Sequence, residues 1–194
     1  MRQNLSIKSM LMNFFIKFNF LAFFLFAACV GFSQTPEDFL QESSLLLEQE
    51  INAQNGNQAI IQQEGRDNET EIVQQLTDRE KANIAQLLQS GEFNLAIVRQ
   101  AGEANKLALV QQGSNNYYEL DLIGSNNNIG IVQQGNDNRI VQKINQVNDL
   151  DIELIQIGND NEIVQILEGN IENKELKIIQ QGDGLSLSIE QSRL

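Results

Sequence analysis

NIGIVQQGNDN, at residues 128–138, has close relatives at residues 105–116, NKLALVQQGSNN, and at residues 57–68, NQAIIQQEGRDN. When every such stretch is aligned on its Asn-like first residue, twelve segments follow one another with a usual spacing of eleven residues. Their common pattern is Asn-x-aliphatic-x-aliphatic-x-Gln-x-Gly-x-x. Apolar positions that recur with period two indicate a β-strand, and the Gly, Asn and Asp residues that follow are typical of turns. Short strands joined by tight turns, without long connections, predict a solenoid.

The true repeat is two segments, about 22 residues, because alternate segments resemble each other more than they resemble their neighbours. A Gln-x-Gly pair marks every first segment, at Gln63/Gly65, Gln89/Gly91, Gln111/Gly113, Gln133/Gly135, Gln156/Gly158 and Gln180/Gly182. The extra residues of the longer units, at 79–82, 149 and 172–173, all lie between units. We therefore expect an all-β, amyloid-like, two-sheet β-solenoid of six strand-turn-strand rungs over residues 57–194, with those six glycines at its corners.

One face of every predicted strand is almost free of charge. The first, third, fifth and seventh positions of a segment share a face, and of these forty-eight residues only Lys174 is charged. Such a face predicts a dry interior. It also carries recurrent amides, each of which would cost about 1–3 kcal/mol if buried without a partner. Stacked rungs, about 4.8 Å apart, let each amide bond the next one. The predicted structural ladder consists of Asn57, Gln63, Asn83, Gln89, Asn105, Gln111, Asn127, Gln133, Gln156 and Gln180.

The N-terminus has the pattern of a secretion signal. Three basic residues precede the apolar run FNFLAFFLFAACVGFSQ at 18–34, so we expect residues 1–34 to be a signal peptide and the protein to be exported. A membrane anchor is the competing interpretation, for which the run is short. Lipidation of Cys29, in FAAC at 26–29, is another. Because Cys29 is the only cysteine, disulfides do not stabilise the mature chain.

The charge of the chain also limits its partners. The formal net charge is −13, and loss of residues 1–34 removes three positive charges and no negative ones, which leaves about −16. A strongly acidic protein is soluble and does not favour nucleic acid. The chain has no His and no Trp, and we identify no paired carboxylates or lysines suited to acid/base chemistry at neutral pH.

The repeats resemble those of a known family. The pattern Asn-x-Ala-x-x-x-Gln-x-Gly-x-x-Asn occurs literally in NQAIIQQEGRDN and in NLAIVRQAGEAN at 94–105, and it is similar to the repeats of curli subunits, secreted bacterial proteins that polymerise into extracellular amyloid fibres. The resemblance covers residues 57–194. It implies self-association, related curli-type subunits as partners, and a fibre at the cell surface that supports adhesion and biofilm matrix. It also implies an outer-membrane secretion apparatus, which would read a leader such as residues 35–56; a solvated tail or an N-terminal cap is the alternative for that leader.

Some positions depart from the family pattern. Leu122, Ile144 and Leu167 replace the Gln of three second segments, and Leu150 and Lys174 replace the Asn of two first segments. The ladders are therefore interrupted on one side. These departures leave open whether the chain is similar to a major subunit or to a nucleator.

The leading hypothesis is a structural fibre subunit, with no catalytic residues, cofactor, metal or small-molecule substrate. Its last predicted strand presents an open edge that invites another chain, and we expect this polymer-end strand to act through Leu185, Leu187, Ile189 and Gln191.

Two other classes remain as alternatives. A monomeric β-solenoid that binds ice or calcium would need outward rows of Thr or Gly-Gly-x-Gly-x-Asp turns, and this chain has few Thr in its strands and one carboxylate in each GNDN turn. A solenoid enzyme would need convergent groups, and neither Asp121 nor Asp151 has a partner that we can identify in the sequence.

Overall fold

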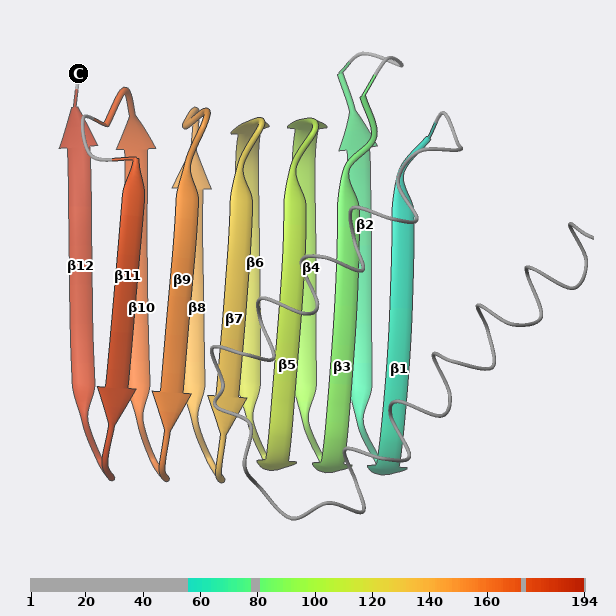
Figure 1. Cartoon of the computed structure of the whole chain (residues 1–194), viewed down its shortest axis with the longest axis vertical. Coiled ribbons are helices and arrows are strands. Elements are labelled where there is room, and N and C mark those ends of the chain that lie inside the picture. The colour runs from blue at the N-terminus through green and yellow to red at the C-terminus, as the bar shows by residue number, and fades with distance from the viewer. Residues whose placement is uncertain (1–55, 78–80, 172–173, 194) are drawn as a thin grey trace, which may run out of the picture. The chain divides into compact units, whose positions relative to one another are not determined.

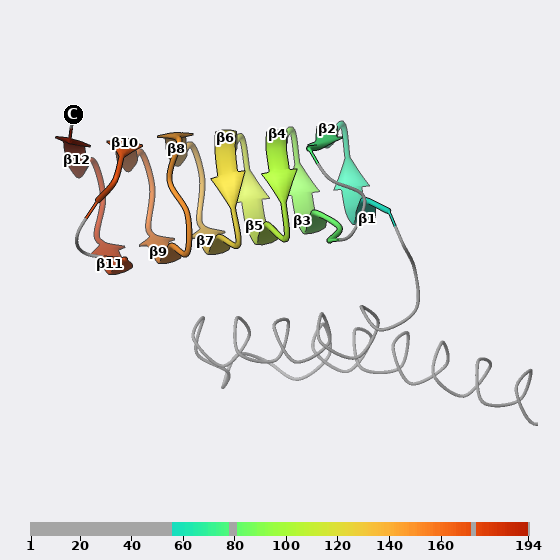
Figure 2. The ribbon, with the colours of Figure 1, turned by 90° about the horizontal axis from the view of Figure 1, so that it is seen from above.

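Two parallel β-sheets of six strands each make up the described part of the computed structural model, which comprises residues 56–77, 81–171 and 174–193. The chain alternates between the sheets, so that each circuit places one strand in each sheet (Figure 1). One circuit is called a rung below. Seen from above, the strands of the two sheets form two facing rows (Figure 2). The predicted signal peptide, and all of the predicted leader except Gly56, lie outside the described residues.

The strand bounds follow the eleven-residue segments closely. The first sheet, sheet A, contains β1 (Gln58–Arg66), β3 (Ile84–Glu92), β5 (Lys106–Ser114), β7 (Asn128–Gln134), β9 (Asp151–Ile157) and β11 (Glu175–Gln181). The second sheet, sheet B, contains β2 (Glu69–Leu76), β4 (Leu95–Glu103), β6 (Tyr117–Ser125), β8 (Arg139–Asn145), β10 (Glu162–Gly169) and β12 (Ser186–Arg193).

The register of the strands matches the repeat. In sheet A, Ile84 pairs with Lys106 and Lys106 with Asn128, so equivalent residues are 22 apart in the middle of the chain. The longer units are accommodated without a change of face, since Asn128 pairs with Asp151 and Asp151 with Glu175. The extra residues therefore lie, in the sequence, between a strand of sheet B and the next strand of sheet A. The predicted two-sheet β-solenoid of six rungs is confirmed.

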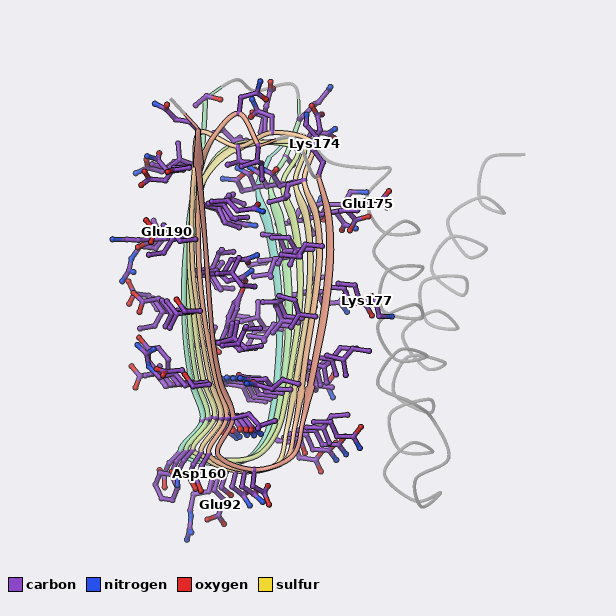
Figure 3. All side chains as sticks on the ribbon, turned by 90° about the vertical axis from the view of Figure 1, so that its left-hand side faces the viewer. Glu92, Asp160, Lys174, Glu175, Lys177 and Glu190 are labelled. Atoms are coloured by element: carbon purple, nitrogen blue, oxygen red, sulfur yellow. The ribbon has the colours of Figure 1, made fainter. Side chains whose placement is uncertain are left out.

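The uncharged face of the strands forms the interior. Successive rungs stack their side chains in rows, inside and outside the two sheets (Figure 3). The interior side chains of the four middle rungs are almost fully buried, and they form one hydrophobic cluster shared by both sheets, which includes Ala85, Leu87, Val98, Leu109, Leu120, Ile131 and Leu154. Period-two patterning thus produced the expected core, because alternate residues of a strand point to opposite faces.

Glycine at the corners permits the close approach of successive rungs. Gly113 has a φ of 115°, and a Cβ at this position would overlap the carbonyl oxygen of Gly135 in the next rung. Both features require glycine. Two residues later, Asn115 has a φ of 57°, which Asn tolerates better than most residues. Gly113 and Asn115 of this turn therefore each have a structural reason.

Candidate functional site

The glutamines of sheet A form a continuous hydrogen-bonded ladder. Each Nε2 donates to the Oε1 of the next rung, at 2.6 Å (Gln63 to Gln89), 2.8 Å (Gln89 to Gln111), 2.9 Å (Gln111 to Gln133), 3.1 Å (Gln133 to Gln156) and 2.9 Å (Gln156 to Gln180). The side chains of the four inner members are fully buried. The structure therefore brings all six predicted glutamines of this row together.

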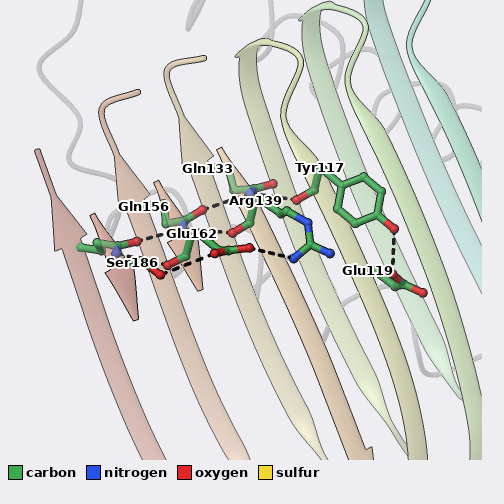
Figure 4. A network of polar contacts seen from close by, with 8 residues as sticks. Tyr117, Glu119, Gln133, Arg139, Gln156, Glu162 and Ser186 are labelled. Atoms are coloured by element: carbon green, nitrogen blue, oxygen red, sulfur yellow. Dashed lines mark hydrogen bonds and ion pairs between the residues drawn. The ribbon is translucent and has the colours of Figure 1, made fainter. Parts of the chain in front are cut away.

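These amides also bond the backbone of the facing strand. The Nε2 of Gln133 donates to the carbonyl of Tyr117 at 3.0 Å, and that of Gln156 to the carbonyl of Arg139 at 3.2 Å. Figure 4 shows this part of the ladder beside the outer residues of sheet B. One row of side chains thus links neighbouring rungs and also links the two sheets.

Asparagines form two further ladders, one at each edge of the solenoid. The backbone N–H and the Nδ2 of Asn105 both donate to the Oδ1 of Asn83, at 3.1 and 3.0 Å, and Asn127 bonds Asn105 in the same way. The Nδ2 of Asn105 also donates to the carbonyl of Gly124 at 2.8 Å. The second row contains Asn68, Asn94, Asn116, Asn138 and Asn161. Buried Asn is satisfied here because each amide has partners in the rungs on both sides of it.

The two kinds of ladder have opposite polarity. A Gln side chain donates toward the next rung along the chain, as from Gln111 to Gln133, whereas an Asn donates toward the previous one, as from Asn105 to Asn83. The two ends of the solenoid therefore differ chemically. The first rung presents the side-chain oxygens of its glutamines as acceptors. Its asparagine N–H groups are donors, and a rung placed before the first one would have to supply acceptors for them.

Sheet B has only part of a glutamine ladder, as its sequence indicates. Gln74 donates to Gln100 at 2.8 Å, and the next register position is Leu122. Within the described part of the chain, the buried Nε2 of Gln100 has no hydrogen-bond partner. Gln191 occupies the same row in the last rung, where it pairs in register with Leu167.

Sequence analysis missed a second polar row inside sheet B. The hydroxyl of Tyr118 donates to Gln142 at 2.8 Å, and Gln142 donates to Gln165 at 2.7 Å; all three side chains are fully buried. Burial raises the pKa of Tyr118 well above its usual value, so its hydroxyl stays protonated. The available signal was Gln at the fifth position of two successive second segments, where other segments have an aliphatic residue.

The predicted corner glycines occupy one edge of the solenoid. Among Gly65, Gly91, Gly113, Gly135, Gly158 and Gly182, each of the first five packs against the backbone carbonyl of the glycine in the next rung. The opposite edge also uses glycine, since a Cβ on Gly102 would overlap the carbonyl oxygen of Gly124. That second glycine corner was not predicted, because only part of its row is glycine.

Charged residues on the outer face of sheet B pair between rungs. Arg139 bonds Glu162 at 3.1 Å, and its guanidinium lies 5.3 Å from the centroid of the Tyr117 ring (Figure 4). Arg99 lies within 3.5 Å of carboxylate oxygens of both Glu119 and Asp121. Exposed pairs of this kind contribute about 0.2–1 kcal/mol each. Their main effect is on register, because a shift of one residue would separate the opposite charges.

The two end rungs expose the interior face. In the first rung Ile61 is 47% exposed and Gln63 is exposed, whereas their equivalents two rungs later, Leu109 and Gln111, are buried. In the last rung Leu185 is 41% exposed, and the polymer-end residues Leu187, Ile189 and Gln191 lie on the same inward row of β12. The described solenoid is therefore open at both ends.

Comparison with protein-family models, with curated proteins and with solved structures finds no match to this chain. Among the described residues there is no cluster of three His, Cys, Asp or Glu side chains that could hold a metal ion. The same residues contain no helix with the length and hydropathy needed to span a bilayer. The amide ladders and the open end rungs are thus the features from which a function can be argued.

Proposed function

We propose that this protein is an exported structural subunit that polymerises end to end into a curli-like, amyloid-like extracellular fibre. The observation that carries the proposal is the pair of open end rungs, which expose apolar and amide side chains that the middle rungs bury. A sheet edge with unpaired backbone groups and an apolar inner face is a template for another strand. The glutamine rows and the apolar rows of one end fit those of the other.

The side chains of the two ends match when the register is continued. Placing the first rung of a second copy after β11 and β12 sets Gln180 against Gln63 and Gln191 against Gln74. Gln63 uses its Nε2 on Gln89 and on Thr70, which leaves its Oε1 as the acceptor that a preceding rung would use. The joint would thus extend the sheet A ladder with the polarity it already has. It would also explain why the seventh-position row of sheet B has glutamine in its first two rungs and in its last rung, with aliphatic residues between them.

The apolar rows match in the same way. Leu176 and Ile178 of β11 would cover Ala59 and Ile61 of β1, as each inner rung covers its neighbour. Because the two ends differ, this contact is heterologous, and its repetition gives an open filament rather than a closed ring. Six rungs at about 4.8 Å each make a subunit about 29 Å long along the fibre axis.

The remaining parts of the proposal rest on the sequence. The signal pattern of residues 1–34 supports export, and the resemblance to curli repeats supports related subunits and an outer-membrane secretion apparatus as partners. A role in adhesion and biofilm matrix follows from the same resemblance. The structural role itself requires no catalytic group and no cofactor.

The proposal is tested on the purified mature chain, residues 35–194, at micromolar concentration. We expect unbranched fibres by negative-stain electron microscopy, an increase in amyloid-dye fluorescence with a lag, and removal of that lag by preformed seeds. Protein that stays monomeric and dye-negative over weeks would contradict the proposal and would favour a monomeric ligand-binding solenoid.

A further inference from the structure

Granted the proposed end-to-end assembly, we infer that Lys174 and Leu185 make the joint between subunits weaker than the contacts between rungs inside a subunit, and so limit growth of the fibre. Both residues stand at the first position of a segment, where every segment of the inner rungs except the one that begins at Leu150 has Asn. The glutamine ladder of sheet A can cross the joint, whereas neither asparagine ladder can.

Inside the solenoid, the side-chain oxygen of each ladder asparagine accepts a hydrogen bond from the following rung. The Oδ1 of Asn94 accepts the backbone N–H of Asn116 at 3.1 Å, and that of Asn138 accepts the N–H of Asn161 at 3.2 Å. The Oδ1 accepts the backbone N–H of the following rung even where that rung has no Asn at the equivalent position, since Asn161 accepts the N–H of Leu185 at 3.0 Å. Each of these oxygens therefore satisfies a backbone donor of the following rung.

The joint between two copies lacks this acceptor. There, the following rung begins with Asn57 and Asn68 of the next copy, whose backbone N–H groups would need an acceptor on the side chains of Lys174 and Leu185. An ammonium and an alkyl group have no acceptor. Two backbone donors would thus be buried at each joint without the partner that their equivalents have inside the chain, and such groups weaken an interface.

The joint still forms without these acceptors. The chain contains one step of the same kind, because Leu150 precedes Lys174 in the first-segment row and the strands nevertheless pair in register, Asp151 with Glu175. Backbone pairing and apolar contact therefore suffice to stack rungs without this asparagine. Loss of the two acceptors lowers the affinity of the joint and does not abolish it.

The substituted positions can be changed without disturbing the core of the monomer. Leu185 is 41% exposed, and the side chain of Lys174 is 42% exposed, where it pairs with Asp149 at 3.3 Å. Leu185→Asn supplies the missing Oδ1 at every joint of a fibre. Leu185→Ala removes the same alkyl group without supplying an acceptor, and it is the matched control.

The test compares wild type, Leu185→Asn and Leu185→Ala by the concentration of monomer that remains when fibre growth has stopped. We expect this critical concentration to fall about three- to tenfold for Leu185→Asn, the effect of one added hydrogen bond of ordinary net strength, and to stay level or rise for Leu185→Ala. Lys174→Asn, with Lys174→Ala as its control, should act in the same direction at the other edge. Denaturation of each soluble monomer measures any change within the subunit separately, because the Nδ2 introduced by Leu185→Asn would also donate to Asn161, as that of Asn161 does to Asn138.

The outcomes separate the inference from the proposed function. Wild-type fibres with an unchanged or higher critical concentration for both Asn variants would overturn the inference and leave end-to-end assembly standing. Failure of wild type and of both Asn variants to form fibres would overturn the proposed function, and the inference with it. Fibres from the Asn variants alone would support a joint weakened at these two positions and would overturn assembly of the wild-type chain by itself.

Discussion

Replacing Gln133 with Leu is the perturbation that most directly measures what the buried amide ladder contributes to stability. Gln133 accepts from Gln111 at 2.9 Å and donates to Gln156 at 3.1 Å and to the carbonyl of Tyr117 at 3.0 Å. Leucine has a similar volume and supplies none of these bonds. The Nε2 of Gln111 keeps two backbone acceptors, Leu95 and Asn116, so the main damage falls on the side of Gln156.

The size of the effect follows from those contacts. Two buried acceptors, the Oε1 of Gln156 and the carbonyl of Tyr117, lose a donor, at about 1–3 kcal/mol each. The greater hydrophobicity of Leu offsets about 1 kcal/mol of this loss. We therefore expect Gln133→Leu to lower the free energy of unfolding by about 3 kcal/mol.

Gln100→Leu is the matched control, at the equivalent position of sheet B. The Nε2 of Gln100 is buried and has no partner among the described residues, and its register neighbour in the next rung is already Leu122. The substitution removes an unpaired donor and extends an aliphatic row. The only bond it removes is the one that the Nε2 of Gln74 donates to the Oε1 of Gln100, and Gln74 is partly exposed, so water can replace that acceptor. We expect a change of less than about 1 kcal/mol, in either direction.

Both variants are compared with wild type by urea denaturation of freshly prepared monomer, followed by far-ultraviolet circular dichroism at a concentration too low for assembly. A loss confined to Gln133→Leu, with an unchanged denaturant slope, supports the ladder as a stabilising network. Equal losses for the two variants would show that the hydrogen bonds of Gln133 add nothing beyond burial. No loss for Gln133→Leu would show that the acceptors left unbonded have no measurable cost. Either result would refute the reasoning.

Three further variants test other parts of the structure. Gly113→Ala should lower the free energy of unfolding by about 3 kcal/mol, because its φ of 115° and the carbonyl of the next rung both exclude a Cβ; a melting temperature equal to that of wild type would contradict this. Tyr118→Phe should cost about 1–2 kcal/mol by denaturation, because the buried Oε1 of Gln142 loses its donor at 2.8 Å, and a neutral result would imply another donor there. The double variant Leu187→Lys/Ile189→Asp should stay soluble and β-rich by circular dichroism yet fail to extend wild-type seeds, because charges on the inward row of β12 would be buried at the joint; normal extension would place the polymer contact elsewhere.

Much of this fold could be predicted from sequence because the same pattern of strand and turn residues recurs in twelve segments. A single segment such as residues 128–138 is too short to separate a strand from other structures by periodicity alone. Twelve copies in one register leave little ambiguity about which face is buried. That face is marked by its lack of charge, since Lys174 is the only charged residue among its forty-eight positions. The extra residues at 79–82, 149 and 172–173 could be assigned to the segments between units for the same reason, since an insertion anywhere else would break the register.

The parts that sequence analysis missed depend on contacts between rows that the repeat does not encode. Tyr118 bonds Gln142 two positions further along the strand in the next rung, so this pair crosses from the third position of one segment to the fifth of another. Alignment by equivalent positions cannot show such a diagonal contact. The Nε2 of Gln100 is a similar case, since it has no partner among the described residues because the next register position is Leu122, which the pattern of its own segment does not show.

The central claim, that subunits continue one solenoid end to end, is tested most directly by electron cryomicroscopy of the fibre at a resolution that separates strands. The account predicts strands about 4.8 Å apart along the axis, in two facing sheets, with a chemical repeat of six rungs, about 29 Å, and Gln180 of one subunit beside Gln63 of the next. A fibre with one whole subunit in each layer of about 4.8 Å, or one in which solenoids associate only side by side, would contradict it.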